Sequence, residues 1–138
     1  METQQRYTFP KSEKLKSRKA IEQLFTTGKS FSNFPFRIVY LFTANEKIKT
    51  GVQAGFSVST RNFKNATDRN RIKRLIREAY RLQKHALAAA VAASGKKLFL
   101  FFIFTGNELP DYDLIFEKTG SALKRLKKIT DETAAANS

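Results

Sequence analysis

Apolar residues recur along the chain with two different spacings, and each spacing predicts one type of secondary structure. In residues 18–27 they stand three and four positions apart, as on one face of a helix, and Ser17 can cap the first turn. Gly28 stands where a residue in the left-handed conformation often follows a helix. From Phe36 to Thr43, successive residues instead fall alternately on two faces, which predicts a strand that starts after Pro35.

A polar turn at 45–50 separates this strand from a second one, whose two faces differ. Val52, Ala54, Phe56 and Val58 lie on one face, and Gln53, Gly55, Ser57 and Ser59 lie on the other. Because the second set is small and polar, we expect its face to stay open. Residues 97–105, KLFLFFIFT, are apolar on both faces, which predicts a strand in the middle of a sheet.

A long helix is predicted between these two strands, over residues 66–86. Asn65, followed three positions later by Asp68, is a pair that can cap its first turn and complement the helix dipole. The alanine-rich stretch 86–93 extends or frays this helix, and the Ser-Gly pair at 94–95 ends it. The pattern therefore predicts one continuous helix that weakens toward its end.

A last helix is predicted in the C-terminal part of the chain. Either Asp111 or Asp113 can cap it, and we expect it to end near Lys128. Its inward-facing residues should be Ile115, Phe116, Ala122, Leu123 and Leu126. The pattern thus predicts three helices and three strands, with two of the strands consecutive in the chain.

The composition favours one folded domain. Hydrophobic residues make up 41% of the 138 residues, which is too much for a disordered polycation and enough for one core. We expect a domain at 12–129, between a flexible segment at 1–11 and a disordered tail at 130–138. The sequence has no run of about 18 apolar residues and no signal-peptide core, which predicts a cytoplasmic protein.

The charge points to a polyanionic partner. The chain has 26 Lys and Arg against 12 Asp and Glu, a formal net charge of +14, which attracts nucleic acid above all. It has no Cys, and His85 is its only histidine, so neither a zinc site nor a nucleophile with its base is easily assembled. The acidic residues are dispersed rather than clustered for a two-metal nuclease. Binding is therefore favoured over catalysis by the polypeptide.

The predicted long helix concentrates this charge on one side. At about 100° per residue, one face carries Ile72, Leu75, Ile76, Ala79 and Leu82, and the opposite face carries Arg69, Lys73, Arg74, Arg77, Arg81 and Lys84. A solvated face usually mixes charges of both signs, but Glu78 is the only acid between Arg69 and Lys84. The planar guanidinium group of arginine can hold a phosphate or stack on an unpaired base, which favours folded RNA as the partner. DNA is less favoured, because neither helix-turn-helix spacing nor a dimerising zipper is present.

The stretch from Gly55 to Arg81, GFSVSTRNFKNATDRNRIKRLIREAYR, is similar to the signature of the ribonuclease P protein family. It has a strand ending in Ser-Val-Ser, a short loop and the Arg-Asn-Arg motif, and residues Lys14–Gly28 resemble the family's first helix. The resemblance implies an α/β fold, an α+β sandwich of the ribosomal protein S5 domain 2-like type. Its mostly antiparallel four-stranded sheet would carry three helices and a left-handed βαβ crossover.

The same resemblance implies a function in tRNA processing. The chain would be the non-catalytic protein subunit of ribonuclease P, whose catalytic RNA removes the 5′ leader of precursor tRNA with bound Mg2+. Its partners would be that RNA and precursor tRNA, with no membrane and no obligate protein partner. The residues expected to contact the catalytic RNA are Arg69, Asn70, Arg71, Lys73, Arg74, Arg77 and Arg81. Arg69 and Asn70 fit local capping equally well, and Arg71 fits a solvent-facing position.

The family also has a cleft between the first helix and the open sheet face, which receives the single-stranded leader. By resemblance it would contain Ile21, Phe25, Ser57, Ser59, Thr60 and Arg61. Phe25 either stacks on a leader base or packs in the core as the i+4 partner of Ile21. Ile21 replaces a usual aromatic residue and Thr60 a common lysine, so weaker stacking and a weaker phosphate contact are expected. Whether Val39 or Tyr40 reaches the cleft stays open.

Two alternative functions follow from fewer features of the sequence. The net charge alone also fits a basic structural RNA-binding protein of the ribosomal-protein type. The open polar sheet face alone fits a nuclease that needs no RNA subunit. For that second alternative, we predict that the RNA-free protein does not cleave precursor tRNA.

Overall fold

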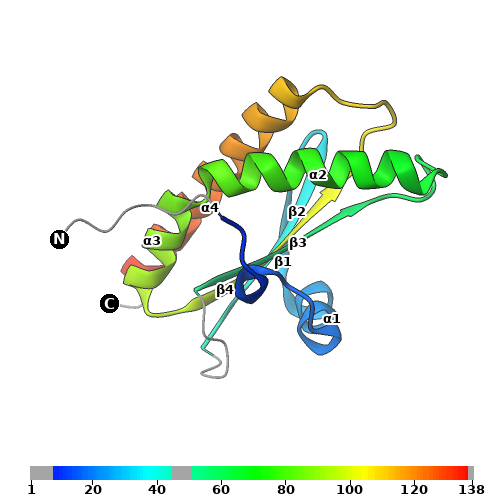
Figure 1. Ribbon diagram of the computed structural model, residues 1–138. Coiled ribbons are helices and arrows are strands. Elements are labelled where there is room, and N and C mark those ends of the chain that lie inside the picture. The colour runs from blue at the N-terminus through cyan, green and yellow to red at the C-terminus, as the bar shows by residue number, and fades with distance from the viewer. Residues whose placement is uncertain (1–7, 45–50, 137–138) are drawn as a thin grey trace.

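A four-stranded sheet with helices on both faces organises the chain (Figure 1). The computed structural model describes residues 8–44 and 51–136, with only the backbone for 134–136. In chain order the elements are η1 (Lys11–Glu13), α1 (Arg18–Thr27), β1 (Lys29–Asn33), β2 (Phe36–Thr43), β3 (Val52–Val58), α2 (Ala66–Gln83), α3 (His85–Ser94), β4 (Lys97–Phe104) and α4 (Tyr112–Ala136). The predicted turn at 45–50 lies outside the described residues.

The strands lie in the order β1, β2, β4, β3, so β4 has a neighbour on each side, as its apolar sequence predicted. β2 is antiparallel to both β1 and β4, whereas β3 is parallel to β4, which confirms the mostly antiparallel sheet. The connection from β3 to β4 contains α2 and α3, because parallel neighbours need a long crossover. The hydrophobic pattern did not predict the edge strand β1, since Phe31 is its only buried residue.

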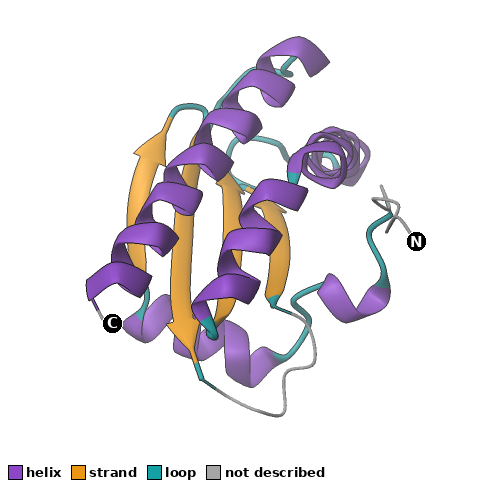
Figure 2. Cartoon of the chain, turned by 90° about the vertical axis from the view of Figure 1, so that its left-hand side faces the viewer, coloured by secondary structure: helices purple, strands orange, loops and turns teal. Residues whose placement is uncertain are grey.

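Each face of the sheet has its own hydrophobic core. On one face, α2, α3 and α4 cover alternate strand residues such as Ile38 and Leu100, which are fully buried. On the other face, Leu24 of α1 packs against Val39 and Phe99. Figure 2 shows the sheet between these two layers of helices. β2 and β4 contribute to both cores, which explains why both of their faces are apolar.

The ends of α1 confirm one predicted cap and correct another. The hydroxyl of Ser17 accepts a hydrogen bond from the backbone amide of Ala20, 3.2 Å away. Gly28 is in the extended conformation, with φ −74°, so the predicted left-handed residue is wrong. A Cβ atom there would press on the carbonyl oxygen of Leu24 and lie 2.8 Å from that of Tyr40. Glycine is needed at this position because the last turn of α1 and strand β2 both lie close to it, not because of its backbone angles.

The long helix predicted over 66–86 consists of two helices that meet at Lys84. The described residues therefore contain four α-helices, where the resemblance implied three. The second of the pair, α3, is formed by the alanine-rich stretch and ends at Gly95, whose φ of 75° is left-handed. At the start of α2, Asn65 occupies the cap position but its side chain makes no capping hydrogen bond, so the predicted pair with Asp68 is wrong.

α4 is longer than the sequence predicted. The carboxylate of Asp111 accepts a hydrogen bond from the backbone amide of Leu114 at 2.9 Å, which confirms it as the cap. The helix continues through Ala136, so residues 130–136 are helical and the predicted disordered tail is wrong for them. Phe116, predicted to face inward, is exposed. None of the described helices is long and apolar enough to span a bilayer.

The N-terminal segment is anchored at the end of α2. The ring of Phe9 packs edge-on against that of Tyr80, with centroids 5.5 Å apart. The ammonium group of Lys84, a residue only 5% exposed, lies 2.6 Å from the carboxylate of Glu13. Lys84 therefore belongs to the interior and not to the cationic face on which the pattern placed it. Residues 1–7 of the predicted flexible segment lie outside the described residues.

Candidate RNA-binding interface

α2 turns its basic side away from the sheet. The residues buried beneath it are Ile72, Ile76, Ala79 and Tyr80, and the residues exposed on its outer side include Asn70, Arg71, Arg74 and Arg77. Tyr80 was not among the predicted core residues. Because it is buried, the core-facing side of α2 lies at a different angle around the helix axis from the predicted one. As a result Leu82 is exposed and Leu75 only partly buried.

Three of these exposed residues form an arginine row, defined here as Arg71, Arg74 and Arg77. They follow one another at a spacing of three, so each is a neighbour of the next on the helix surface. None of them forms an ion pair with any residue in the described parts of the chain. The row is therefore a set of uncompensated positive charges, available to phosphate groups.

Arg69 is held by the turn that precedes α2. Its guanidinium donates hydrogen bonds to the carbonyl oxygens of Phe63 and Lys64, at 2.8 and 2.9 Å. This is the local capping role that the sequence left open, and it stabilises the turn between β3 and α2. Lys73 is half-buried beside the core face. Arg69 and Lys73 thus lie closer to the sheet than the arginine row does.

Arg81 forms an ion pair and hydrogen bonds with Glu78 one turn earlier on α2. Hydrogen bonding from Arg81 lowers the pKa of Glu78, and the same bond raises the pKa of Arg81. Glu78 is the only acid between Arg69 and Lys84, so this pair leaves the arginine row free of a competing negative charge. The charge of Arg81 is in turn less available to RNA than the pattern predicted.

The predicted cleft corresponds to the α1 face of the sheet, bordered by Ile21 and Phe25 of α1 and by Ser57 of β3. Its floor is a row of paired residues across the strands: Ser32 opposite Arg37, Arg37 opposite Ile103, and Ile103 opposite Ser57. Directly paired residues project to the same face. Ser32 and Arg37 are exposed, and Ile103 and Ser57 are half-buried. The floor therefore presents one cation and two hydroxyl groups around an apolar centre.

Two aromatic rings close one side of this floor. Phe25 of α1 is 48% exposed, and its ring lies 5.3 Å from that of Phe101 in an edge-on arrangement. The ring of Phe101 covers Gly55, where a Cβ atom would approach it to 2.6 Å. Gly55, in the middle of the polar face of β3, is therefore buried, which corrects the expectation that all of this face stays open. Ile21 packs into the smaller core beside these rings.

The other end of the cleft is the turn that follows β3. The amide of Arg61 donates a hydrogen bond to the hydroxyl of Ser59 at 3.2 Å, and the side chains of Thr60 and Arg61 are exposed. The same turn leads into α2. The cleft and the arginine row are therefore joined through one short segment, residues 59–65.

Sequence reasoning missed two residues of the cleft, Arg37 and Phe101. The alternation in β2 had already placed Arg37 and Val39 on one face, and the structure shows that this is the α1 face. Tyr40 belongs to the larger core, whereas Val39 lies on the α1 face and is buried in the smaller core. Phe101 gave no signal of its own, because both faces of β4 are apolar.

A model of one protein family matches the part of the chain that carries these features. The model described as Ribonuclease P matches residues 9–127, a range that includes both cores, the arginine row and the cleft. The chain belongs to the ribonuclease P protein family. Ribonuclease P matures the 5′ ends of tRNA, so the chain is the protein component of an endoribonuclease and associates with ribonuclease P RNA. The alternative of a ribosomal-type structural protein is not favoured.

Relatives within the ribonuclease P family match nearly the whole chain. It is similar to the ribonuclease P protein component of Porphyromonas gingivalis, with 33% identity over 127 residues and 92% of each chain covered. For the component of Chlorobium phaeobacteroides the identity is 30%, over 85% of this chain and 86% of the relative. The solved RNase P protein from Thermotoga maritima has a TM-score of 0.64 at 25% identity, covering 82% of this chain and 96% of that one. The expected ribonuclease P fold is thereby confirmed.

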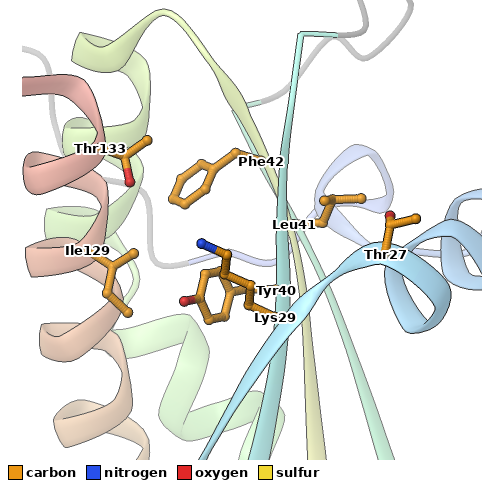
Figure 3. Close-up of a pocket in the computed structure, with 7 residues that line it drawn as sticks. All are labelled: Thr27, Lys29, Tyr40, Leu41, Phe42, Ile129 and Thr133. Atoms are coloured by element: carbon orange, nitrogen blue, oxygen red, sulfur yellow. The ribbon is translucent and has the colours of Figure 1, made fainter. Parts of the chain in front are cut away.

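A metal-ligand search and a second surface feature complete the description of this ribonuclease P protein. The described residues contain no group of three or more His, Cys, Asp or Glu side chains that could hold a metal ion. A pocket of about 220 Å³ lies between β2 and α4, lined by Thr27, Lys29, Tyr40, Leu41, Phe42, Ile129 and Thr133 (Figure 3). Its lining shares no residue with the arginine row or the cleft floor.

Proposed function

We propose that this ribonuclease P protein binds two RNAs at once, the catalytic RNA on α2 and the unpaired 5′ leader of precursor tRNA in the cleft. The observation that carries the proposal is the arginine row, which is exposed and has no ion-pair partner in the described parts of the chain. Like charges at this spacing destabilise an isolated helix, and phosphates remove that repulsion.

The catalytic RNA is the partner that suits α2. Each guanidinium of the arginine row can hold a phosphate through two parallel hydrogen bonds. The exposed amide of Asn70 adds a donor and an acceptor that can read a base edge or a 2′-hydroxyl. Glu78 does not oppose these contacts, because Arg81 neutralises it.

The leader is the partner that suits the cleft. Arg37 can bind a phosphate on the cleft floor, and the exposed ring of Phe25 offers a surface on which a base can stack. Stacking on a side chain requires a base that is not already stacked in a duplex, which favours a single strand. Because residues 59–65 join the cleft to α2, the leader would enter beside the catalytic RNA.

The chemistry is assigned to the RNA subunit. The protein would neutralise phosphates and position the leader, while magnesium held by the RNA and the substrate supplies the metal chemistry of hydrolysis. Fewer magnesium ions are then needed to screen the assembled RNAs. We expect this assembly in the cytoplasm, as the sequence predicted.

Processing of precursor tRNA by the cognate ribonuclease P RNA tests the first half of the proposal. At low magnesium, the wild-type protein should restore processing, and the triple variant Arg71→Ala, Arg74→Ala, Arg77→Ala should restore much less. The protein without RNA should cleave nothing. If the cognate RNA processes precursor equally well at low magnesium with and without the protein, the proposal is wrong.

Binding of precursor and mature tRNA to the reconstituted complex tests the second half. One lost stacking contact is worth about 1 to 3 kcal/mol, so Phe25→Ala should weaken binding of precursor by about 5- to 150-fold. Mature tRNA, which lacks the leader, is the matched control and should bind unchanged. An equal loss for both RNAs would show that the Phe25 ring only packs against Phe101.

A further inference from the structure

One short segment of this basic protein is acidic. Four of its 12 acidic residues, Glu108, Asp111, Asp113 and Glu117, fall between positions 108 and 117. All four side chains are exposed. Lys118 is the only basic residue between Lys97 and Lys124. This segment therefore repels RNA, whereas most of the chain attracts it.

The exposed apolar side chains gather at the same place. Phe34 is 70% exposed and Leu109 is 50% exposed, and with Leu114 of α4 they line a groove of about 260 Å³. This acidic groove is lined by Phe34, Pro35, Phe104, Gly106, Asn107, Glu108, Leu109, Pro110, Asp111 and Leu114. Single exposed apolar residues are ordinary, but several around one groove mark an interaction site.

Hydrogen bonds fix the segments that carry the lining of the acidic groove. The amide of Thr105 donates to the carbonyl oxygen of Pro35 at 2.8 Å, which ties the start of β2 to the end of β4. The side-chain amide of Asn62 donates to the carbonyl oxygen of Gly106 at 3.2 Å. Near α4, the side-chain amide of Asn33 donates a hydrogen bond to the carbonyl oxygen of Lys118 at 3.0 Å. A preformed groove costs little ordering on binding.

We propose that the acidic groove binds a protein segment in which apolar side chains alternate with lysine or arginine. The apolar side chains would cover Phe34 and Leu109, and the basic ones would meet Glu108 and Glu117, the latter one helical turn after Leu114. RNA is excluded by the charge, which leaves protein as the partner class. The proposal does not depend on the RNA contacts assigned above.

A second copy of the chain fits the acidic groove less well. A two-fold symmetric pair would place the same acidic face against itself, and like charges across an interface are destabilising. A head-to-tail contact would need a rotation that closes a ring, and any other rotation would lead to open chains of molecules. The charge complementarity therefore favours a different, basic protein.

Two short synthetic peptides test the proposal on the full-length protein without RNA. Both carry the same leucine and phenylalanine residues, separated by lysine and arginine in one and by glutamate in the other. The rest of the protein is positive, so it repels the basic peptide and suppresses its nonspecific binding. Fluorescence anisotropy should show saturable binding of the basic peptide, reduced about tenfold or more by Leu109→Ser and by Phe34→Ser.

Matched variants separate the groove from general effects of hydrophobicity and charge. Leu82→Ser removes an exposed leucine elsewhere and should leave binding unchanged. The double variant Glu108→Lys, Glu117→Lys should abolish binding, whereas Glu22→Lys on α1 should not. The proposal is overturned if the basic peptide does not saturate, or if the groove variants bind it like wild type. It is also overturned if sedimentation shows a dimer that Leu109→Ser dissociates, since the occupant is then a second copy.

Discussion

Removing two arginines of the row should change how salt affects RNA binding, and the size of the change follows from the structure. Arg74 and Arg77 are neighbours on the outer side of α2, both exposed, and neither has an ion-pair partner among the described residues. Replacing both with Ala creates no cavity and keeps a strong helix former at each position. The double variant should therefore fold like wild type and lose two phosphate contacts.

Each phosphate contact contributes about 0.7 to 0.9 to the slope of log K against log salt concentration. Two lost contacts should reduce that slope by about 1.4 to 1.8. If the electrostatic contribution vanishes near 1 M salt, affinity at tenfold lower salt should fall by about 25- to 60-fold. That loss corresponds to about 2 kcal/mol of binding free energy.

Filter binding or anisotropy with ribonuclease P RNA over a range of salt concentrations measures the slope. The matched control is Lys124→Ala, Lys128→Ala, which removes the same charge from exposed positions on α4. Circular dichroism checks that both double variants are folded. A wild-type slope in the arginine variant would show that Arg74 and Arg77 face water and not phosphates, and an equal reduction in the control would show that only the net charge of the protein matters.

Three further predictions concern stability. Lys84→Met should lower the free energy of unfolding by about 3 kcal/mol or less in urea titrations, because Glu13 loses its partner but keeps some solvent contact. Adding Glu13→Gln should recover part of the loss. No recovery would contradict the ion-pair explanation. Burial raises the pKa of Tyr80, so the fold favours the neutral form of this side chain. The resulting contribution to the free energy of unfolding is present below a pH of about 10 and is lost as the pH rises above it. Tyr80→Phe should flatten the alkaline loss, and an unchanged pH dependence of unfolding would count against it. Gly28→Ala should lower the free energy of unfolding by about 1 to 3 kcal/mol in the same urea titration, because the added Cβ would press on the carbonyl oxygen of Leu24. An unchanged unfolding midpoint would mean that the chain relaxes around Gly28.

Strongly periodic segments could be predicted from the sequence alone. α1, β2, β3 and β4 begin and end within a residue or two of their predicted bounds, because their apolar residues recur with the period of the element they form. Helical geometry also placed Arg74 and Arg77 of the arginine row on the cationic face, since it relates residues three and four apart without any knowledge of the rest of the fold, but it placed Arg71 off that face. These features depend on interactions within a few residues of the chain.

Features that depend on distant contacts were decided only by the tertiary structure. The break at Lys84 occurs where that side chain pairs with Glu13, far away in the sequence, and no local period announces such a partner. The short strand β1 exists because β2 pairs with it. The same is true of the cleft, where Phe101 approaches Phe25 only after α1 packs on the sheet. Local spacing determines which element a segment forms, but long-range packing determines which of its side chains meet water and which meet each other.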